Sequence, residues 1–293
     1  MVDEDETNAQ QGGPGRLAEA LGGVAPVDAH AHVFPPRLFE AIWDYFDRHY
    51  WRVKYRLNAS QVADFYDAAG FAGFTTFNYA HKPGISAKMN QFTHDFCRKH
   101  PSAIPFGTVH PGDPDPAGVA EEALSSYGFV GLKFQLLVTD FPAHDPRLFP
   151  VYDVVRREDA VLAFHAGTGP LPNRHVGVRH FRKFLERYPD LRVQVAHLGC
   201  YEYSEFFALL DKYHDLYLDS AMILVDHDLF PSGFDLGIEA LLDHQDRLLF
   251  GSDFPNLPYS FEESYRHVLS LGLPQGFLRR FFRLNADAFY RRS

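Results

Sequence analysis

The sequence is poor in cysteine, in basic residues and in long apolar runs, and each shortage argues against a class of protein. Cys97 and Cys200 are the only cysteines in 293 residues, which argues against a disulfide framework and suits a reducing, cytoplasmic compartment. Asp and Glu outnumber Lys and Arg by 38 to 28, and at a net charge of −10 we expect no nucleic-acid partner. No apolar run approaches the roughly 18 residues that span a membrane, so we expect no membrane segment either.

The N-terminal stretch also lacks what a folded segment needs. Residues 3–6 are all acidic, residues 12–15 are glycine and proline, and apolar side chains are scarce. The stretch has neither the basic start nor the apolar centre of a secretory signal. We therefore expect a disordered tail over residues 1–22 and a single domain over residues 23–293.

What the sequence does contain is a regular alternation of strand-like and helix-like segments. Eight strand-like runs recur about every 30 residues, seven of them preceded by a helical segment, with no linker between them. The runs cover residues 27–32, 71–79, 103–109, 129–135, 161–165, 192–197, 216–220 and 247–253. This pattern predicts an α/β fold, a single (β/α)₈ TIM barrel. A doubly wound open sheet is the alternative, but it favours a glycine-rich turn after the first strand, where this chain has histidines and prolines.

Polar residues recur at the same phase of this repeat. His30 and His32 are two residues apart and share one face of the first strand. Lys133 lies near the end of the fourth run, His165 and His197 close the fifth and sixth, and these three follow one another at intervals of 32 residues; Asp253 closes the eighth. Any one of them could be an ordinary buried polar residue, but packing alone does not explain the shared phase. Because the carboxyl ends of barrel strands meet at one mouth, we expect these side chains to form one site.

The residue types at these positions favour metal chemistry. Imidazoles and a carboxylate suit a borderline divalent ion such as Zn²⁺, with one position left for water. An ion of this kind lowers the pKa of bound water to about 7, which makes hydroxide available at neutral pH. The sequence therefore predicts one divalent metal ion, with Zn²⁺ as first choice.

Four motifs at these positions resemble the amidohydrolase superfamily of metal-dependent TIM-barrel hydrolases. They are His30-Ala31-His32, Phe164-His165-Ala166-Gly167, Val195-Ala196-His197-Leu198-Gly199 and Phe250-Gly251-Ser252-Asp253-Phe254-Pro255. The most similar branch is the amidohydrolase-related group, which includes aminocarboxymuconate semialdehyde decarboxylase and several lactonases. The likeness runs from about Val24 to Tyr290 and specifies fold and metal site much more strongly than substrate.

The resemblance implies a role for each motif residue. His30, His32, His165 and Asp253 would hold one metal, with His197 beside the water as an acid/base and Asp253 able to take the water's proton. In binuclear members a fourth-strand lysine is carbamylated and bridges two metals, and Lys133 could supply it. The most similar branch works with one ion, so we expect one.

Further polar residues near the expected mouth are candidate substrate contacts, although an ordinary solvated loop position is the alternative for each. They are His81, His110, Lys133, Arg174 and Asp219. The Arg174 guanidinium could pair with a substrate carboxylate. The aromatic segment 38–55 either covers the mouth, where substrate could sit, or is a packed amphipathic helix. Cys200 is expected to be a small buried residue and not a nucleophile, because a metal site needs no thiol.

Three functions are compatible with this sequence. The first is a metal-dependent hydrolase that cleaves a lactone, ester or amide-type bond of a small molecule. The alternative is a nonoxidative decarboxylase of a small carboxylated ring or muconate-type substrate, and the third is a non-catalytic metal-binding barrel. His165-Ala166-Gly167 departs from the His-Pro that we associate with the decarboxylases, which favours hydrolysis. A homodimer is a further expectation.

Overall fold

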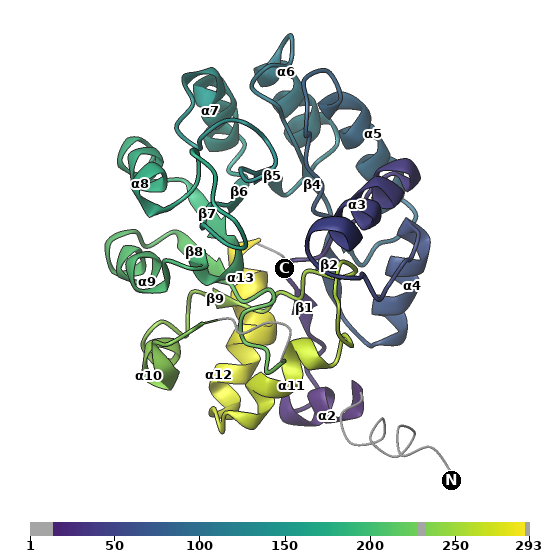
Figure 1. Cartoon of the computed structure of the whole chain (residues 1–293), viewed down its shortest axis with the longest axis vertical. Coiled ribbons are helices and arrows are strands. Elements are labelled where there is room, and N and C mark those ends of the chain that lie inside the picture. The colour runs from purple at the N-terminus through teal and green to yellow at the C-terminus, as the bar shows by residue number, and fades with distance from the viewer. Residues whose placement is uncertain (1–13, 228–232, 291–293) are drawn as a thin grey trace.

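The computed structural model describes residues 14–227 and 233–290 and shows parallel strands enclosed by a ring of helices (Figure 1). The strands are β1 (Val27–Asp28), β2 (Gly73–Thr75), β3 (Ala103–Ile104), β4 (Phe106–Gly107), β5 (Gly131–Gln135), β6 (Val161–His165), β7 (Arg192–Val195), β8 (Leu216–Asp219) and β9 (Leu248–Leu249). Each lies within one of the runs predicted from the sequence, and every paired strand is parallel.

The strands follow one another around the barrel in chain order. β1 to β3 form one hydrogen-bonded ladder and β4 to β9 another. Pro105 separates β3 from β4, because proline has no amide hydrogen to give to a ladder. The two ends of the order meet where the Ala29 N–H donates to the Phe250 carbonyl and the His32 N–H donates to the Phe254 carbonyl, both at 2.8 Å. The prediction of a TIM barrel is confirmed.

The helices alternate with the strands and bury their apolar faces against them. They are α2 (Pro14–Ala20), α3 (Pro36–His49), α4 (Ala59–Ala68), α5 (Ser86–Cys97), α6 (Pro116–Glu121), α7 (Phe149–Arg157), α8 (Val178–Arg187), α9 (Tyr203–Lys212), α10 (Gly237–Asp243), α11 (Glu263–Ser270), α12 (Gln275–Arg279) and α13 (Asn285–Phe289). In α8 the buried residues are Val178, Phe181, Phe184 and Leu185, which is the spacing of one helix face. No helix in the described part of the chain has both the length and the apolar character to cross a membrane.

The expectation of a disordered tail reaching residue 22 is wrong for the part that the structure describes. Leu17 of α2 and Leu21, which directly follows that helix, lie in the core, where both are almost fully buried. The Gln275 side chain at the start of α12 donates to the Ala20 carbonyl at 3.2 Å. These contacts attach residues 14–21 to the domain, and the remainder of the expected tail, residues 1–13, lies outside the described residues.

Candidate metal centre

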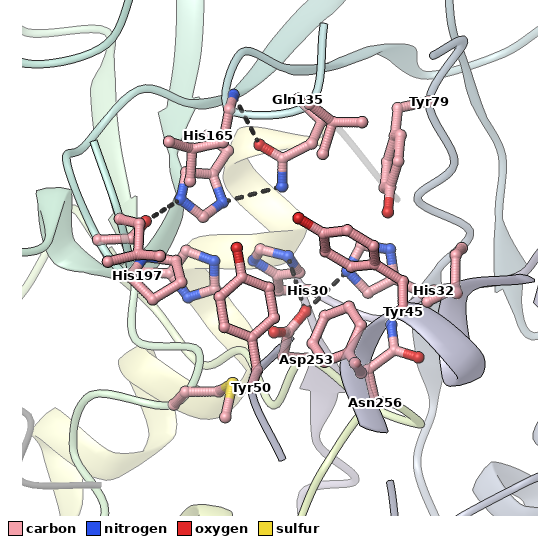
Figure 2. A pocket seen from close by; sticks show the side chains of 18 of the residues that line it. His30, His32, Tyr45, Tyr50, Tyr79, Gln135, His165, His197, Asp253 and Asn256 are labelled. Atoms are coloured by element: carbon pink, nitrogen blue, oxygen red, sulfur yellow. Dashed lines mark hydrogen bonds and ion pairs between the residues drawn. The ribbon is translucent and has the colours of Figure 1, made fainter. Parts of the chain in front are cut away.

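Three of the predicted metal ligands meet at the carboxyl end of the barrel. His30, His32 and Asp253 are buried, and each offers one ligand atom within 4.8 Å of the others. The His32 Nε2 lies 2.7 Å from the Asp253 Oδ1, and the His30 Nε2 lies 3.4 Å from the same oxygen (Figure 2). The segment that follows β1 therefore presents both imidazoles to one side, as the period of two predicts. The carboxylate reaches them from the segment after β9.

Hydrogen bonds to Nδ1 direct the opposite ring nitrogens of these histidines toward the centre. The Nδ1 of His30 lies 3.0 Å from both carboxylate oxygens of Asp219, and the Nδ1 of His32 lies 3.1 Å from the Phe77 carbonyl. A histidine that donates from Nδ1 keeps the lone pair of its Nε2 for a metal. Asp219 is fully buried and also receives the Gln194 side chain at 2.6 Å. It therefore orients the His30 ring and does not line the pocket, so the expectation that it contacts substrate is wrong.

Asp28 ties the end of β1 to the segment after β9. One of its oxygens accepts the backbone N–H groups of His30 and Ser252 at 2.9 and 3.1 Å, and the other accepts the Tyr66 hydroxyl at 2.7 Å. Burial raises the pKa of Asp28 to about 7 even though these hydrogen bonds lower it. Asp28 thus holds the backbone of the two ligand-bearing segments together, a role for which the sequence offered no signal beyond its position beside His30.

The protonation states of the group suit a divalent cation. Burial, together with the positive charge of Lys133, holds the pKa of His30 well below its usual range. Burial alone would raise the pKa of Asp253, but the hydrogen bond from His32 and the nearby imidazole charges outweigh it and keep that pKa below its usual value. Imidazole nitrogens and a carboxylate oxygen are the ligand atoms that Zn²⁺ and similar ions bind, so these residues fit a metal ion.

His165 lies beside this group but is not part of it. Its Nε2 donates to the Gly169 carbonyl at 2.8 Å, and its Nδ1 lies 3.1 Å from the side-chain nitrogen of Gln135. Both ring nitrogens therefore face the chain's own polar groups, although the ring centroid is 4.5 Å from that of His197. Gln135 was not singled out in the sequence, yet it is paired with His165 in the β5–β6 register. Its place as last residue of the predicted fourth strand was the available signal.

Lys133 lies deeper in the barrel than the mouth, where the sequence analysis expected it. It lies two residues before the end of β5, is almost fully buried, and its Nζ is 4.4 Å from the centroid of the Phe77 ring. No described residue accepts a hydrogen bond from this Nζ. Burial lowers the pKa of Lys133 to about 8, although Asp219 and Asp253 act in the opposite direction. The side chain points into the barrel interior beneath the ligands, so the expectation that it contacts substrate is wrong.

His197 stands where an acid/base is expected. Its ring centroid is 4.9 Å from that of His30, and its Nδ1 lies 2.8 Å from the Ala221 carbonyl. Its backbone φ is +57°, a left-handed conformation that is uncommon outside glycine, asparagine and aspartate. The Asp219 carboxylate accepts the His197 N–H at 3.1 Å and so helps to hold this turn. The ring is partly exposed and faces the pocket.

A pocket of about 540 Å³ opens above these residues. His30, His32, His165, His197 and Asp253 all line it, and α3 supplies much of one wall. Figure 1 shows α3 closer to the barrel axis than α4 and α5. Trp51 follows α3 in the pocket wall, and its Nε1 donates to the Asn256 carbonyl at 2.8 Å. The aromatic segment 38–55 therefore covers the mouth, as one of its two interpretations expected.

Of the remaining candidate substrate contacts, the structure brings only His81 to the pocket. The Arg174 guanidinium lies exposed at the surface, where it pairs with Asp140 at 3.1 Å. The Nδ1 of His110 accepts the Gly112 N–H of its own turn at 3.0 Å, so His110 serves local structure. Cys200 is buried at the pocket wall, and burial raises the pKa of its thiol to about 11, which agrees with a small packed residue and not a nucleophile.

One family model matches nearly the whole barrel, and this match identifies the family of the chain. The model described as Amidohydrolase matches residues 27–292. The chain belongs to the amidohydrolase family. This amidohydrolase is thus a member of a metal-dependent enzyme family, and its buried His30, His32 and Asp253 could bind the metal. The matched residues, 27–292, are nearly the same as the range from about Val24 to Tyr290 over which the sequence resembles the superfamily.

Solved structures show the same fold at low identity. An uncharacterised TIM-barrel protein from Bordetella bronchiseptica is 19% identical with a TM-score of 0.72, covering 92% of this amidohydrolase and 100% of that chain. A 5-carboxyvanillate decarboxylase from Novosphingobium aromaticivorans, with bound manganese, is 15% identical with a TM-score of 0.66, covering 94% and 98%. A probable 2-pyrone-4,6-dicarboxylic acid hydrolase from Acinetobacter baumannii is 15% identical with a TM-score of 0.63, covering 92% and 100%. None of the curated proteins matches this amidohydrolase.

Proposed function

We propose that this amidohydrolase is a metal-dependent hydrolase that cleaves a lactone, ester or amide-type bond with one Zn²⁺ ion. One observation carries the proposal: the buried group of His30, His32 and Asp253 forms the floor of a large pocket, with His197 at its edge. His165 completes the proposed ligand set once its ring turns away from Gln135 and Gly169. The ion, when bound, polarises a carbonyl and lowers the pKa of water.

The chain's own residues supply the proton transfers and the orientation. Because the Nδ1 of His197 lies against the Ala221 carbonyl, its Nε2 is the nitrogen able to accept a proton. His197 takes a proton from the attacking water and returns it to the leaving oxygen or nitrogen. The low pKa of Asp253 keeps this carboxylate ionised, so it binds the cation at neutral pH.

Nonoxidative decarboxylation of a carboxylated ring is the second candidate. The observation in its favour is the fold shared with the Novosphingobium decarboxylase, which at 15% identity supports the scaffold and not the reaction. The guanidinium expected to meet a substrate carboxylate, that of Arg174, lies paired at the surface. Release of CO₂ from hydroxybenzoates, with no hydrolysis of lactones or esters, would favour this candidate over ours.

The decisive experiment separates His197 from the metal ligands. Asparagine is among the residues that tolerate a left-handed backbone, so His197→Asn preserves the turn at φ +57°. We expect His197→Asn to keep its metal while kcat on a lactone or ester falls about 10²-fold or more. Asp253→Asn should lose both metal and activity. Elemental analysis and rates measured on the same preparations make the comparison, and loss of metal from His197→Asn in proportion to activity would show that His197 is a ligand.

A further inference from the structure

We infer that the substrate is an uncharged lactone or ester carrying a bulky apolar group, and that the pocket disfavours a carboxylate elsewhere on the same molecule. This inference rests on the proposed function and narrows it to a substrate class. It comes from the walls and rim of the pocket, not from the metal centre.

The rim of the pocket concentrates the large apolar side chains that the structure leaves exposed. Seven such residues occur among the described residues, and five of them line this pocket: Tyr45, Tyr50, Val138, Leu171 and Tyr201. Leu171 is 65% exposed and Val138 50%. Exposed apolar patches around a cavity often mark binding surfaces. Covering this apolar surface with a ligand removes it from water, which lowers the free energy of the complex. We take the occupant of this rim to be the apolar part of a substrate whose reacting bond lies in the adjoining cavity.

The same pocket has no fixed cation in its walls. Among the described residues that line it there is neither lysine nor arginine, and Asp253 adds a negative charge at the floor. Lys133 lies beneath the ligands and Arg174 is paired with Asp140 outside. A substrate carboxylate held away from the metal would therefore be removed from water without a Lys or Arg side chain to pair with it, which is costly.

Away from the floor of the pocket, hydroxyl and amide groups supply polar contacts without charge. Figure 2 shows the hydroxyl groups of Tyr45 and Tyr50 pointing into the pocket, and Gln135 and Asn256 also line it. Phenol and amide groups donate hydrogen bonds to carbonyl and ether oxygens without requiring charge on the ligand. A cavity of about 540 Å³ has room for an acyl or aryl group beyond the reacting bond.

Two matched substrate series test the inference. γ-Lactones with alkyl chains of increasing length are compared with the same lactones ending in a carboxylate, using the metal-loaded enzyme. We expect kcat/KM to rise up to about fourfold per methylene in the alkyl series. The terminal carboxylate should lower kcat/KM at least about tenfold. Equal or faster hydrolysis of the carboxylated series would overturn the inference and leave the proposed function intact.

Binding measured without turnover separates the two proposals. Trp51 lines the pocket and Trp43 does not, so the fluorescence of a Trp43→Phe enzyme reports on the pocket. Alkyl γ-lactams serve as non-hydrolysed analogues, and we expect their affinity to rise with chain length and to fall on addition of a carboxylate. If no lactone, ester or amide is hydrolysed but this order of affinity holds, the proposed function fails, while the preference of the pocket for an uncharged ligand with an apolar group stands. Affinity indifferent to chain length overturns the substrate class.

A charge placed on the rim provides the matched variant. Leu171→Arg should raise KM for the alkyl lactones at least about fivefold and lower it for the carboxylated ones, since it adds the missing cation. Leu284, 46% exposed and outside the pocket, gives the control Leu284→Arg, which should change neither. If Leu171→Arg alters only the oligomeric state seen by light scattering, with KM unchanged for both series, the rim is an interface between copies and the inference is overturned.

Discussion

His30 shows how one side chain depends on three others for its chemistry. Its Nδ1 is held by Asp219, its backbone N–H by Asp28, and its Nε2 faces Asp253. A neutral histidine can donate from one nitrogen only, so the Asp219 contact decides which nitrogen is left for a metal. The orientation of the His30 ring, and the ring nitrogen that it offers, therefore depend on buried carboxylates as well as on the histidine itself.

Gly251 keeps His30 in place by having no side chain. A Cβ at Gly251 would lie 2.6 Å from the His30 Cβ and 3.2 Å from an Asp219 oxygen, so one of them must move. We expect Gly251→Ala to weaken Zn²⁺ affinity at least about tenfold, the scale seen when an orienting contact is lost. Competition with a chelator measures this. Gly276→Ala, where a Cβ meets nothing within 4 Å, is the control, and equal affinities in both variants would contradict the prediction.

Strand β5 shows how an element separates two residues that the sequence alone treats alike. Lys133 and Gln135 are on the same side of the strand, but Gln135 reaches the pocket while Lys133 remains in the layer below. The residues of a barrel interior stack in such layers. The Lys133 ammonium is buried and donates no hydrogen bond to any described residue, so it is a cost to stability and not a substrate contact.

Replacing Lys133 should therefore stabilise the protein. The pKa of Lys133 is about 8 in the folded state and about 10.5 in the unfolded chain, so below pH 8 burial of the charged ammonium costs about 3 kcal/mol of stability. Lys133→Met removes this cost. Between pH 8 and 10.5 the unfolded chain binds the proton and the folded chain does not, so wild-type stability rises with pH and the advantage of the variant shrinks.

Urea unfolding at pH 7 and pH 10 measures this difference. Lys88→Met, at an exposed position of α5, is the control and should show no pH-dependent gain. A Lys133→Met protein that is less stable than wild type at both pH values would mean that Lys133 compensates Asp219 and Asp253.

At the scale of the whole molecule, the proposed metal links the two ends of the barrel. His30 and His32 follow β1, whereas Asp253 follows β9, and few backbone hydrogen bonds join these ends. An ion that binds the folded chain only stabilises it by mass action. We expect removal of the metal by a chelator to lower Tm by about 5 °C or more, and Zn²⁺ to restore it.

Calorimetry with and without chelator checks this expectation. The same shift is expected for His197→Asn, because that variant keeps all the proposed ligands. A Tm that does not respond to chelator in protein shown to contain metal would place the ion away from the junction between β1 and β9.

Local patterns in the sequence determined the barrel and most of the site. The repeat of strand and helix predicted the eight strands, because burial of parallel strands under helices requires that alternation of apolar runs. The phase of the repeat also identified His30, His32, His165, His197 and Asp253, since strand ends in a barrel converge on one mouth.

Only the tertiary structure decided which of two nearby residues on the same face of a strand reaches the pocket, as with Lys133 and Gln135. The offset between neighbouring strands paired Gln135 with His165 and put Lys133 beneath the ligands, and that offset depends on how the whole barrel closes. Tertiary packing likewise placed Asp219 within hydrogen-bond distance of His30 and buried Leu17 in the core. Such contacts join residues far apart in the chain, and no local pattern records which partners packing will bring together.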